Sequence, residues 1–272
     1  MKRNPSVLVG CLYKITLCAA LLIGSNCTCQ KSTPSAQQDK LVVFAAASLR
    51  EAFNAMGEQF RSTHPNVELT FHFSGTQELR TQIEHGASAD IFASADLRQM
   101  DKLAQQGHVL PPVIFTQNKL AVVVAKESAP HIQKLSDLPS ASRIAVGVPE
   151  VPIGQYTLQL LGRMGAEFQT RIEAKVVSRE FNAKQILAKV RLGEAQAGFV
   201  YRTDALSAPE LAVVEIPDKL NPVVKYPMAV IRNTSHSQLA QAWVDFVLSE
   251  AGQSILEDAG FMPLETKHPI GH

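Results

Sequence analysis

The stretch LVVFAAASLREAFNAMGEQF (residues 41–60) sets the architecture of this chain. Its first seven residues form an apolar run, which predicts a buried strand. Ser48 follows, with Glu51 three residues later, and this pair matches the capping box that opens many helices. Apolar side chains then recur at helical spacing, at Leu49, Phe53, Met56 and Phe60. The stretch therefore predicts a strand, a turn at Ser48 and an amphipathic helix.

The same unit recurs in two series. Apolar runs predict further strands at residues 67–73, 90–94, 120–125, 143–147, 172–177, 197–201, 213–216 and 223–231. Helices are expected to open at Ser74–Gln77, Asp96, Pro152 and Asn182, and two more to cover 238–248 and 253–258. Alternating strands and helices predict an α/β fold with mainly parallel sheets flanked by helices. We expect two lobes, residues 41–119 plus 228–265 and residues 120–227, and a C-terminal tail at 266–272.

The N-terminus has the charged, apolar, polar order of an export signal. Lys2 and Arg3 precede the apolar run ITLCAALLIG (15–24), and polar residues follow. Lys14 interrupts the apolar stretch, which argues against a membrane anchor, since spanning needs ~20 apolar residues. We expect a signal segment at 1–29, a polar linker at 30–40 and a periplasmic or other extracytoplasmic location. A lipid anchor on Cys27 or Cys29 is the alternative to simple cleavage.

Composition excludes several classes of function. All four cysteines lie within the first 29 residues, which leaves no disulfide scaffold or thiol nucleophile in the exported part. The net charge is +1, and it is −2 without residues 1–29, which carry three bases and no acid, so no nucleic-acid partner is expected. No phosphate-binding loop or nucleophile elbow occurs, which argues against an enzyme. Of the two aspartates in the segment 90–96, Asp90 is expected to form a hydrogen bond at the end of a strand, and Asp96 is expected to cap a helix.

The candidate ligand-binding groups in this sequence lie mainly at the N-termini of predicted helices. Ser48, Thr76, Ile153 and Ala183 each lie at or near a strand-to-helix turn. In a parallel sheet such turns share the carboxyl edge, where ligands bind. Helix N-termini present N–H groups and partial positive charge, and hydroxyls of Ser48, Thr76 and Tyr201 add donors. Each position taken singly also fits an ordinary helix cap. Together they predict a neutral receptor for an oxyanion.

Several segments resemble one family, the periplasmic molybdate-binding proteins that serve bacterial molybdate ABC transporters. The resemblance covers about residues 41–264. It is carried by VVFAAASLREAF (42–53), FSGTQELRTQIEHGASADIFASAD (73–96), AVGVPEVPIGQY (145–156), GEAQAGFVYRTDA (193–205), KYPMAV (225–230) and AGFMPL (259–264). It implies a type II periplasmic-binding-protein fold, with a hinge between two lobes that hold molybdate or tungstate through uncharged donors.

Residue by residue, the resemblance implies five binding positions. Ser48 and Tyr201 match hydroxyl donors of the family, and Thr76 stands where a second serine is usual. Ile153 and Ala183 match positions that donate a backbone N–H. Ile153 is bulkier than the usual residue there, and the turn before it is one residue shorter. Molybdenum is expected only as the bound oxyanion, with no cofactor.

Other ligands and another class of function stay open. Sulfate has the charge and shape of molybdate, and phosphate is a further tetrahedral oxyanion. A secreted hydrolase is the remote alternative. The expected partner is an inner-membrane ABC permease, and the chain is expected to act as a monomer.

Overall fold

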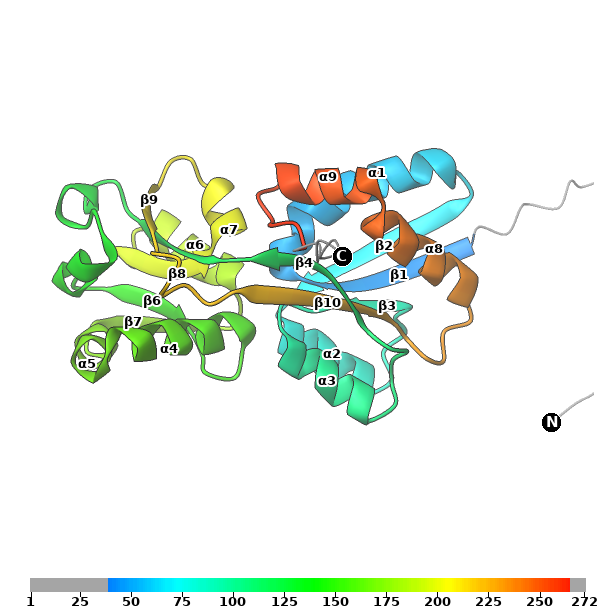
Figure 1. The fold of residues 1–272 in the computed structure, drawn as a ribbon, viewed down its shortest axis with the longest axis horizontal. Coiled ribbons are helices and arrows are strands. Elements are labelled where there is room, and N and C mark those ends of the chain that lie inside the picture. Colours follow the sequence, from blue (N-terminus) through cyan, green and yellow to red (C-terminus); the bar gives the residue numbers. More distant parts are fainter. Residues whose placement is uncertain (1–38, 265–272) are drawn as a thin grey trace, which may run out of the picture. The chain divides into compact units, whose positions relative to one another are not determined.

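The computed structural model describes residues 39–264 (Figure 1). The predicted signal segment 1–29, nearly all of the linker 30–40 and the tail 266–272 lie outside the described residues. Among the described helices, none is long and apolar enough to cross a membrane.

The first sheet has five strands in the order β2-β1-β3-β10-β4. Their bounds are β1 Asp39–Ala46, β2 Val67–Ser74, β3 Ile91–Ala93, β4 Val113–Asn118 and β10 Val224–Val230. Helices cover both faces (Figure 1): α1 (Arg50–Thr63), α8 (Ser237–Leu248) and α9 (Glu250–Asp258) lie on one face, and α2 (Thr76–Glu84) and α3 (Leu97–Gln105) on the other. We call this sheet and its helices the first lobe. The two final helices therefore belong to the first lobe.

The second sheet has the order β7-β6-β8-β5-β9. Its strands are β5 Leu120–Val124, β6 Ile144–Gly147, β7 Val176–Glu180, β8 Ala197–Tyr201 and β9 Ala212–Glu215. Helices α4 (Pro152–Met164) and α5 (Ala166–Glu173) cover one face, and α6 (Ala183–Arg191) and α7 (Arg202–Leu206) cover the other (Figure 1). This sheet and its helices form the second lobe. The strand predicted at 172–177 is wrong in its first part, since Ile172 belongs to α5.

Both sheets are mixed rather than mainly parallel. In each, three neighbouring strands run parallel and the other two pairings are antiparallel. The antiparallel direction follows from the chain path, because β5 and β10 each enter their sheet from the opposite lobe. They begin at the edge where the parallel strands end: Leu120 pairs with Tyr201, the last residue of β8. Residues 224–227, which the sequence placed in the second lobe, belong to β10 of the first sheet.

Two crossings join the lobes, one at Lys119 between β4 and β5 and one between β9 and β10. A buried asparagine lies at each crossing. Asn221, on the second crossing, accepts from the Leu120 N–H (2.9 Å) and donates to the Leu120 backbone oxygen (2.8 Å). Asn118 accepts from the Lys119 N–H (2.9 Å) and donates to Thr203 Oγ1 (3.0 Å). Side-chain amides thus satisfy backbone groups that no ladder pairs at these crossings.

The core of the first lobe confirms the periodicity of the opening stretch. Leu49, Phe53, Met56 and Phe60 are all fully buried. Trp243 of α8 packs edge-on against Phe53 and Phe60, with ring centroids 5.6 and 5.2 Å apart. Edge-to-face aromatic pairs add to the burial of apolar area. This packing anchors α1, and with it the turn that carries Ser48.

Candidate functional site

The register of the first sheet brings two predicted site residues together. Ala46 at the end of β1 pairs with Ser74 at the end of β2. Ser48 and Thr76 each come two residues after this pair, so both lie at the same edge of the sheet. The carboxyl ends of parallel strands thus place the two hydroxyls in one region.

Ser48 does not cap α1. It lies in a 3₁₀ turn, Ala47–Leu49, and α1 begins only at Arg50 with no side-chain cap. The predicted capping box with Glu51 is therefore wrong. The Ser48 Oγ instead lies 2.9 Å from the Tyr226 hydroxyl, a bond between buried groups 178 residues apart. The long-range hydrogen bond to Tyr226 therefore forms in place of the predicted local helix cap.

Thr76 is the first residue of α2 and is buried. Its Oγ1 accepts a hydrogen bond from the Ala95 N–H at 3.2 Å. A hydroxyl oxygen that accepts in this way still has its own proton to donate. Because the Ala95 N–H can only donate, the Thr76 hydroxyl can use its own proton to donate to a ligand in the adjacent cavity.

The second lobe contributes two helix starts. Ile153 is the second residue of α4, after Pro152 at the first position as predicted. Ala183 is the first residue of α6, and Asn182 caps that helix by accepting from the Gln185 N–H at 3.0 Å. First-turn N–H groups have no acceptor within their helix. Both backbones are therefore placed to donate, whatever their side chains.

The turn before α4 is tight because of Gly154. A Cβ at this position would lie 1.9 Å from the Val148 backbone oxygen. Only glycine permits this approach of the β6–α4 turn to the helix start. The shape of this turn thus depends on the backbone at Gly154.

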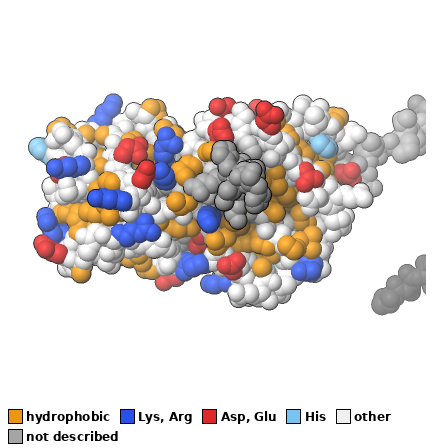
Figure 2. Space-filling view, in the orientation of Figure 1, with side chains coloured by type: hydrophobic (Ala, Val, Ile, Leu, Met, Phe, Trp, Pro, Cys, Tyr) orange, Lys and Arg blue, Asp and Glu red, His pale blue; other side chains and the backbone are white. Residues whose placement is uncertain are grey.

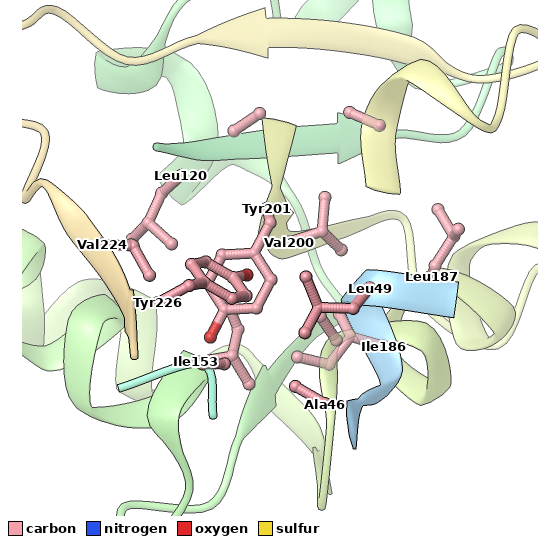
Figure 3. Packing of buried hydrophobic residues seen from close by; sticks show 14 of the residues in the cluster. Ala46, Leu49, Leu120, Ile153, Ile186, Leu187, Val200, Tyr201, Val224 and Tyr226 are labelled. Carbon is pink, nitrogen blue, oxygen red and sulfur yellow. The ribbon is translucent and has the colours of Figure 1, made fainter. Parts of the chain in front are cut away.

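Tyr201 ends β8, and its ring lies beside that of Tyr226, with centroids 6.1 Å apart (Figure 3). The side chain is 3% exposed, and its hydroxyl has no hydrogen-bond partner among the described residues. Burial, with nearby Tyr226, Tyr156, Asp96 and Asp204, raises the pKa of Tyr201 well above its usual range. The hydroxyl stays protonated and needs an acceptor, since an unsatisfied buried polar group is costly.

All five predicted residues line one cavity of about 20 Å³. That volume exceeds the ~10–15 Å³ that one water needs, so the cavity suits a small compact group. None of the described residues that line it is charged; they are Ala46, Ala47, Ser48, Ser74, Gly75, Thr76, Ala95, Pro152, Ile153, Phe181, Asn182, Ala183 and Tyr201. The structure thus brings the predicted set together between the lobes.

Hydrogen bonds and an ion pair connect the two lobes near this cavity. Gln77 Nε2 donates to the Phe181 backbone oxygen at 3.1 Å. Lys184 Nζ bridges Glu51 of the first lobe (2.8 Å) and buried Asp204 of its own lobe (3.1 Å). Gln99 of α3 reaches the backbone oxygen of Glu150. These contacts connect the two lobes, and Phe181, which lines the cavity, is itself 58% exposed.

The two aspartates behave as the structural interpretation predicted. Asp90 accepts from the Val42 N–H at 2.7 Å, and Asp96 caps α3 by accepting from the Gln99 N–H at 2.9 Å. Burial raises the pKa of Asp96, against the opposing effects of the Gln99 N–H and Arg98.

Within residues 39–264 no three His, Cys, Asp or Glu side chains gather as a metal site. The face in Figure 2 carries acidic and basic side chains interspersed.

The model of a family described as bacterial extracellular solute-binding protein matches residues 41–262. The chain belongs to this family. It is 37% identical over 255 residues to the molybdate-binding protein ModA of Mycobacterium tuberculosis (strain H37Rv), covering 90% of this chain and 95% of the relative.

Solved structures share the fold. The periplasmic molybdate-binding protein of Azotobacter vinelandii matches with a TM-score of 0.73 and 19% identity, covering 82% of this chain and 98% of the other. The sulfate-binding protein SubI of M. tuberculosis matches with a TM-score of 0.76 and 16% identity, over 84% and 88%. The solute-binding protein therefore has the type II periplasmic-binding-protein fold predicted for it. That fold alone does not choose between the two oxyanions.

Sequence reasoning missed Tyr226, Phe181 and Ala95. Tyr226 lies inside the apolar run of β10, where a tyrosine is usually interpreted as a core residue. The segment KYPMAV nevertheless belongs to the sequence that resembles the molybdate-binding family. A hydroxyl within an otherwise fully buried strand is a signal that it has a polar partner. Nothing local to Tyr226 indicates that the partner is Ser48.

Proposed function

We propose that this protein captures molybdate, and by the same geometry tungstate, between its lobes and delivers it to an inner-membrane ABC permease. One observation carries the proposal. A small cavity without a charged lining residue is surrounded by donors, and one of them, the Tyr201 hydroxyl, has no partner among the described residues.

Donor chemistry favours a fully deprotonated oxyanion. Such an ion only accepts hydrogen bonds, and the five positions offer hydroxyl or backbone N–H donors. Hydrogen bonds to a charged group contribute about 1.5–3 kcal/mol each, so several offset the cost of taking a dianion out of water. The N-termini of α2, α4 and α6 add partial positive charge at the same place.

The identity of the oxyanion rests on two supports. The M. tuberculosis relative, at 37% identity, is named a molybdate-binding protein. Phosphate that keeps a proton needs an acceptor, and no described carboxylate lines the cavity. Sulfate has the same charge but shorter bonds to oxygen, so a cavity sized for molybdate holds it loosely.

The remaining parts of the proposal follow from this role. The protein works outside the cytoplasm, in the periplasm or held by lipid at Cys27 or Cys29. It acts as a monomer, uses no cofactor, binds no nucleic acid and catalyses no turnover. Molybdate is cargo, held through Ser48, Thr76, Ile153, Ala183 and Tyr201.

Titration calorimetry on the purified protein with molybdate, tungstate, sulfate and phosphate tests the proposal. We expect molybdate and tungstate to bind far more tightly than sulfate, and phosphate to give no measurable heat. Sulfate or phosphate as the tightest ligand would overturn it. Hydrolysis of an ester substrate that is abolished in Ser48→Ala would instead support the hydrolase alternative.

A further inference from the structure

The start of α6 contacts both helix starts of the first lobe. Gln77 of α2 donates from Nε2 to the Phe181 backbone oxygen at 3.1 Å. Glu51, in the first turn of α1, accepts from Lys184 Nζ at 2.8 Å. Phe181 and Lys184 lie in sequence on either side of Ala183, whose backbone N–H is proposed to bind the anion. The two contacts therefore set where this donor lies relative to the first lobe.

Gly75 permits the closer approach of the two. A Cβ on Gly75 would lie 2.8 Å from the Phe181 backbone oxygen and 2.6 Å from Gln77 Nε2. Both distances are well below van der Waals contact. The Gln77 amide is the end of a flexible side chain and can turn away, but the Phe181 oxygen belongs to the backbone just before α6. The substitution Gly75→Ala would therefore displace the start of α6 from the first lobe.

The first lobe does not itself require glycine at this position. The backbone of Gly75 has φ −60° and ψ 134°, an extended conformation that any residue adopts. Within its own lobe, the atoms nearest to an added Cβ are those of the Gln77 amide. The space that the absent side chain leaves is thus used by the backbone of the second lobe.

The contact through Lys184 is the weaker of the two. Asp204 of the second lobe is fully buried, and its Oδ1 lies 3.1 Å from Lys184 Nζ. A buried carboxylate needs a counter-charge, so Lys184 serves the fold of its own lobe as well. The Glu51 side chain, by contrast, is 53% exposed. An ion pair to an exposed partner contributes little free energy, so the approach at Gly75 is expected to dominate.

We propose that Gly75 is a positioning residue, whose lack of a side chain lets the second lobe approach closely enough for the Ala183 N–H to reach the anion. The pair of Lys184 and Glu51 is a second, weaker link with the same effect. Gly75 and Phe181 both line the cavity, so their separation also sets its size. This inference rests on the proposed function, because it concerns the same anion.

Calorimetry and small-angle scattering of Gly75→Ala with molybdate test the proposal. We expect binding to weaken about ten- to a hundredfold, because the added Cβ overpacks the contact between the lobes. At saturating molybdate the variant should have a larger radius of gyration than wild type. Its melting temperature without ligand should match that of wild type. Gly162→Ala is the matched control, because nothing lies within 4 Å of an added Cβ there, and it should bind like wild type.

Gln77→Ala tests the same contact without adding an atom. It removes the hydrogen bond to the Phe181 backbone oxygen and should weaken molybdate binding about two- to tenfold. Unchanged affinity in both Gly75→Ala and Gln77→Ala would overturn the proposal.

Glu51→Gln tests the weaker link. It should weaken molybdate binding less than about fivefold, and this effect should shrink at high salt, because the pair is exposed. Glu194→Gln is the matched control, since Glu194 pairs with Lys189 within the second lobe, and it should leave binding unchanged. An effect of Glu51→Gln larger than that of Gly75→Ala would overturn the assignment of the main contact to Gly75.

Two further outcomes separate this inference from the proposed function. Weaker binding by Gly75→Ala with an unchanged radius of gyration at saturation would overturn the inference alone, because the added Cβ would then only fill the cavity. Failure of the wild-type protein to bind molybdate, tungstate, sulfate or phosphate would overturn the function itself.

Discussion

The two halves of the cavity present different hydrogen-bonding groups. Both lobes have the same strand order and present helix starts at the same sheet edge. The first lobe offers two hydroxyls: Ser48 Oγ lies 2.9 Å from the Tyr226 hydroxyl, and Thr76 Oγ1 accepts from the Ala95 N–H. The second lobe offers backbone N–H groups at Ile153 and Ala183, with one hydroxyl, Tyr201, that has no partner in the described part of the chain.

This difference separates donors that depend on the identity of a side chain from donors that depend on the shape of a turn. A hydroxyl donor disappears when its residue changes. A backbone donor survives most side-chain changes but fails if its turn moves. The first half should therefore be sensitive to conservative substitutions at the binding residues, and the second to substitutions at the glycine that shapes its turn.

The largest expected effect is at Gly154, because a Cβ would lie 1.9 Å from the Val148 backbone oxygen. Gly154→Ala should weaken molybdate binding by about a hundredfold or more, since the backbone donors of the turn move. It should also destabilise the fold by about 1–3 kcal/mol. Gly162→Ala in the same helix is the control, because nothing lies within 4 Å of its Cβ. Calorimetry and thermal unfolding compare the two, and equal affinity would refute the dependence on turn shape.

Tyr201→Phe should weaken molybdate binding about ten- to a hundredfold, through loss of one hydrogen bond to a charged ligand. The ligand-free protein should keep or raise its melting temperature, because the hydroxyl has no partner in the described part of the chain. Calorimetry and melting of the ligand-free form check both halves of this prediction. A large drop in melting temperature would mean that the hydroxyl serves the fold rather than the anion.

Thr76 tests whether the first half depends on its hydroxyls alone. Thr76→Ala should weaken molybdate binding about tenfold, as it removes a donor and leaves the Ala95 N–H without its acceptor. Thr76→Ser retains the hydroxyl and should stay within about threefold of wild type. Should the serine variant prove as weak as the alanine variant, the Thr76 methyl group would be the binding element instead.

Ile153→Ala should change molybdate affinity by less than about threefold, because this position is proposed to donate its backbone N–H. The side chain is 1% exposed, so its loss should still destabilise the fold by about 2–5 kcal/mol. Calorimetry at a temperature well below melting separates the effects. If Ile153→Ala loses most of its molybdate affinity while Tyr201→Phe binds like wild type, the division into side-chain and backbone donors is wrong.

The smallest effect concerns pH. Burial raises the pKa of Asp96, so the folded protein keeps this proton to higher pH than the unfolded chain does. Its contribution to stability is therefore largest at low pH and declines as pH rises from about 3.9 through the raised pKa. Asp96→Asn keeps the helix cap but not the ionisation, so its melting temperature should fall less over that range. Molybdate affinity should stay constant between about pH 6 and 8 in both proteins, since no cavity donor titrates there.

Local pattern predicted much of the fold and five of the residues that line one cavity. The apolar face of α1 and the caps at Asp96 and Asn182 depend on neighbours a few residues away, so periodicity and cap chemistry reveal them. The turns at the carboxyl edge, with the tyrosine at the end of β8, likewise indicated five of the thirteen residues that line the cavity. Strand β4 was missed, because its exposed and buried positions do not alternate cleanly. Helix α5 was missed because it follows α4 after a single glycine.

The chain by itself therefore determined which groups stand at the helix starts, because strand ends and helix caps are short-range features. Only the tertiary structure decided what those groups do. Entry of β5 and β10 from opposite lobes made both sheets mixed, and it carried Tyr226 to within 2.9 Å of Ser48, 178 residues away in sequence. That pairing replaced the predicted capping box. The partner of the Ser48 hydroxyl is a residue distant in sequence, and no local sequence pattern encodes such a contact.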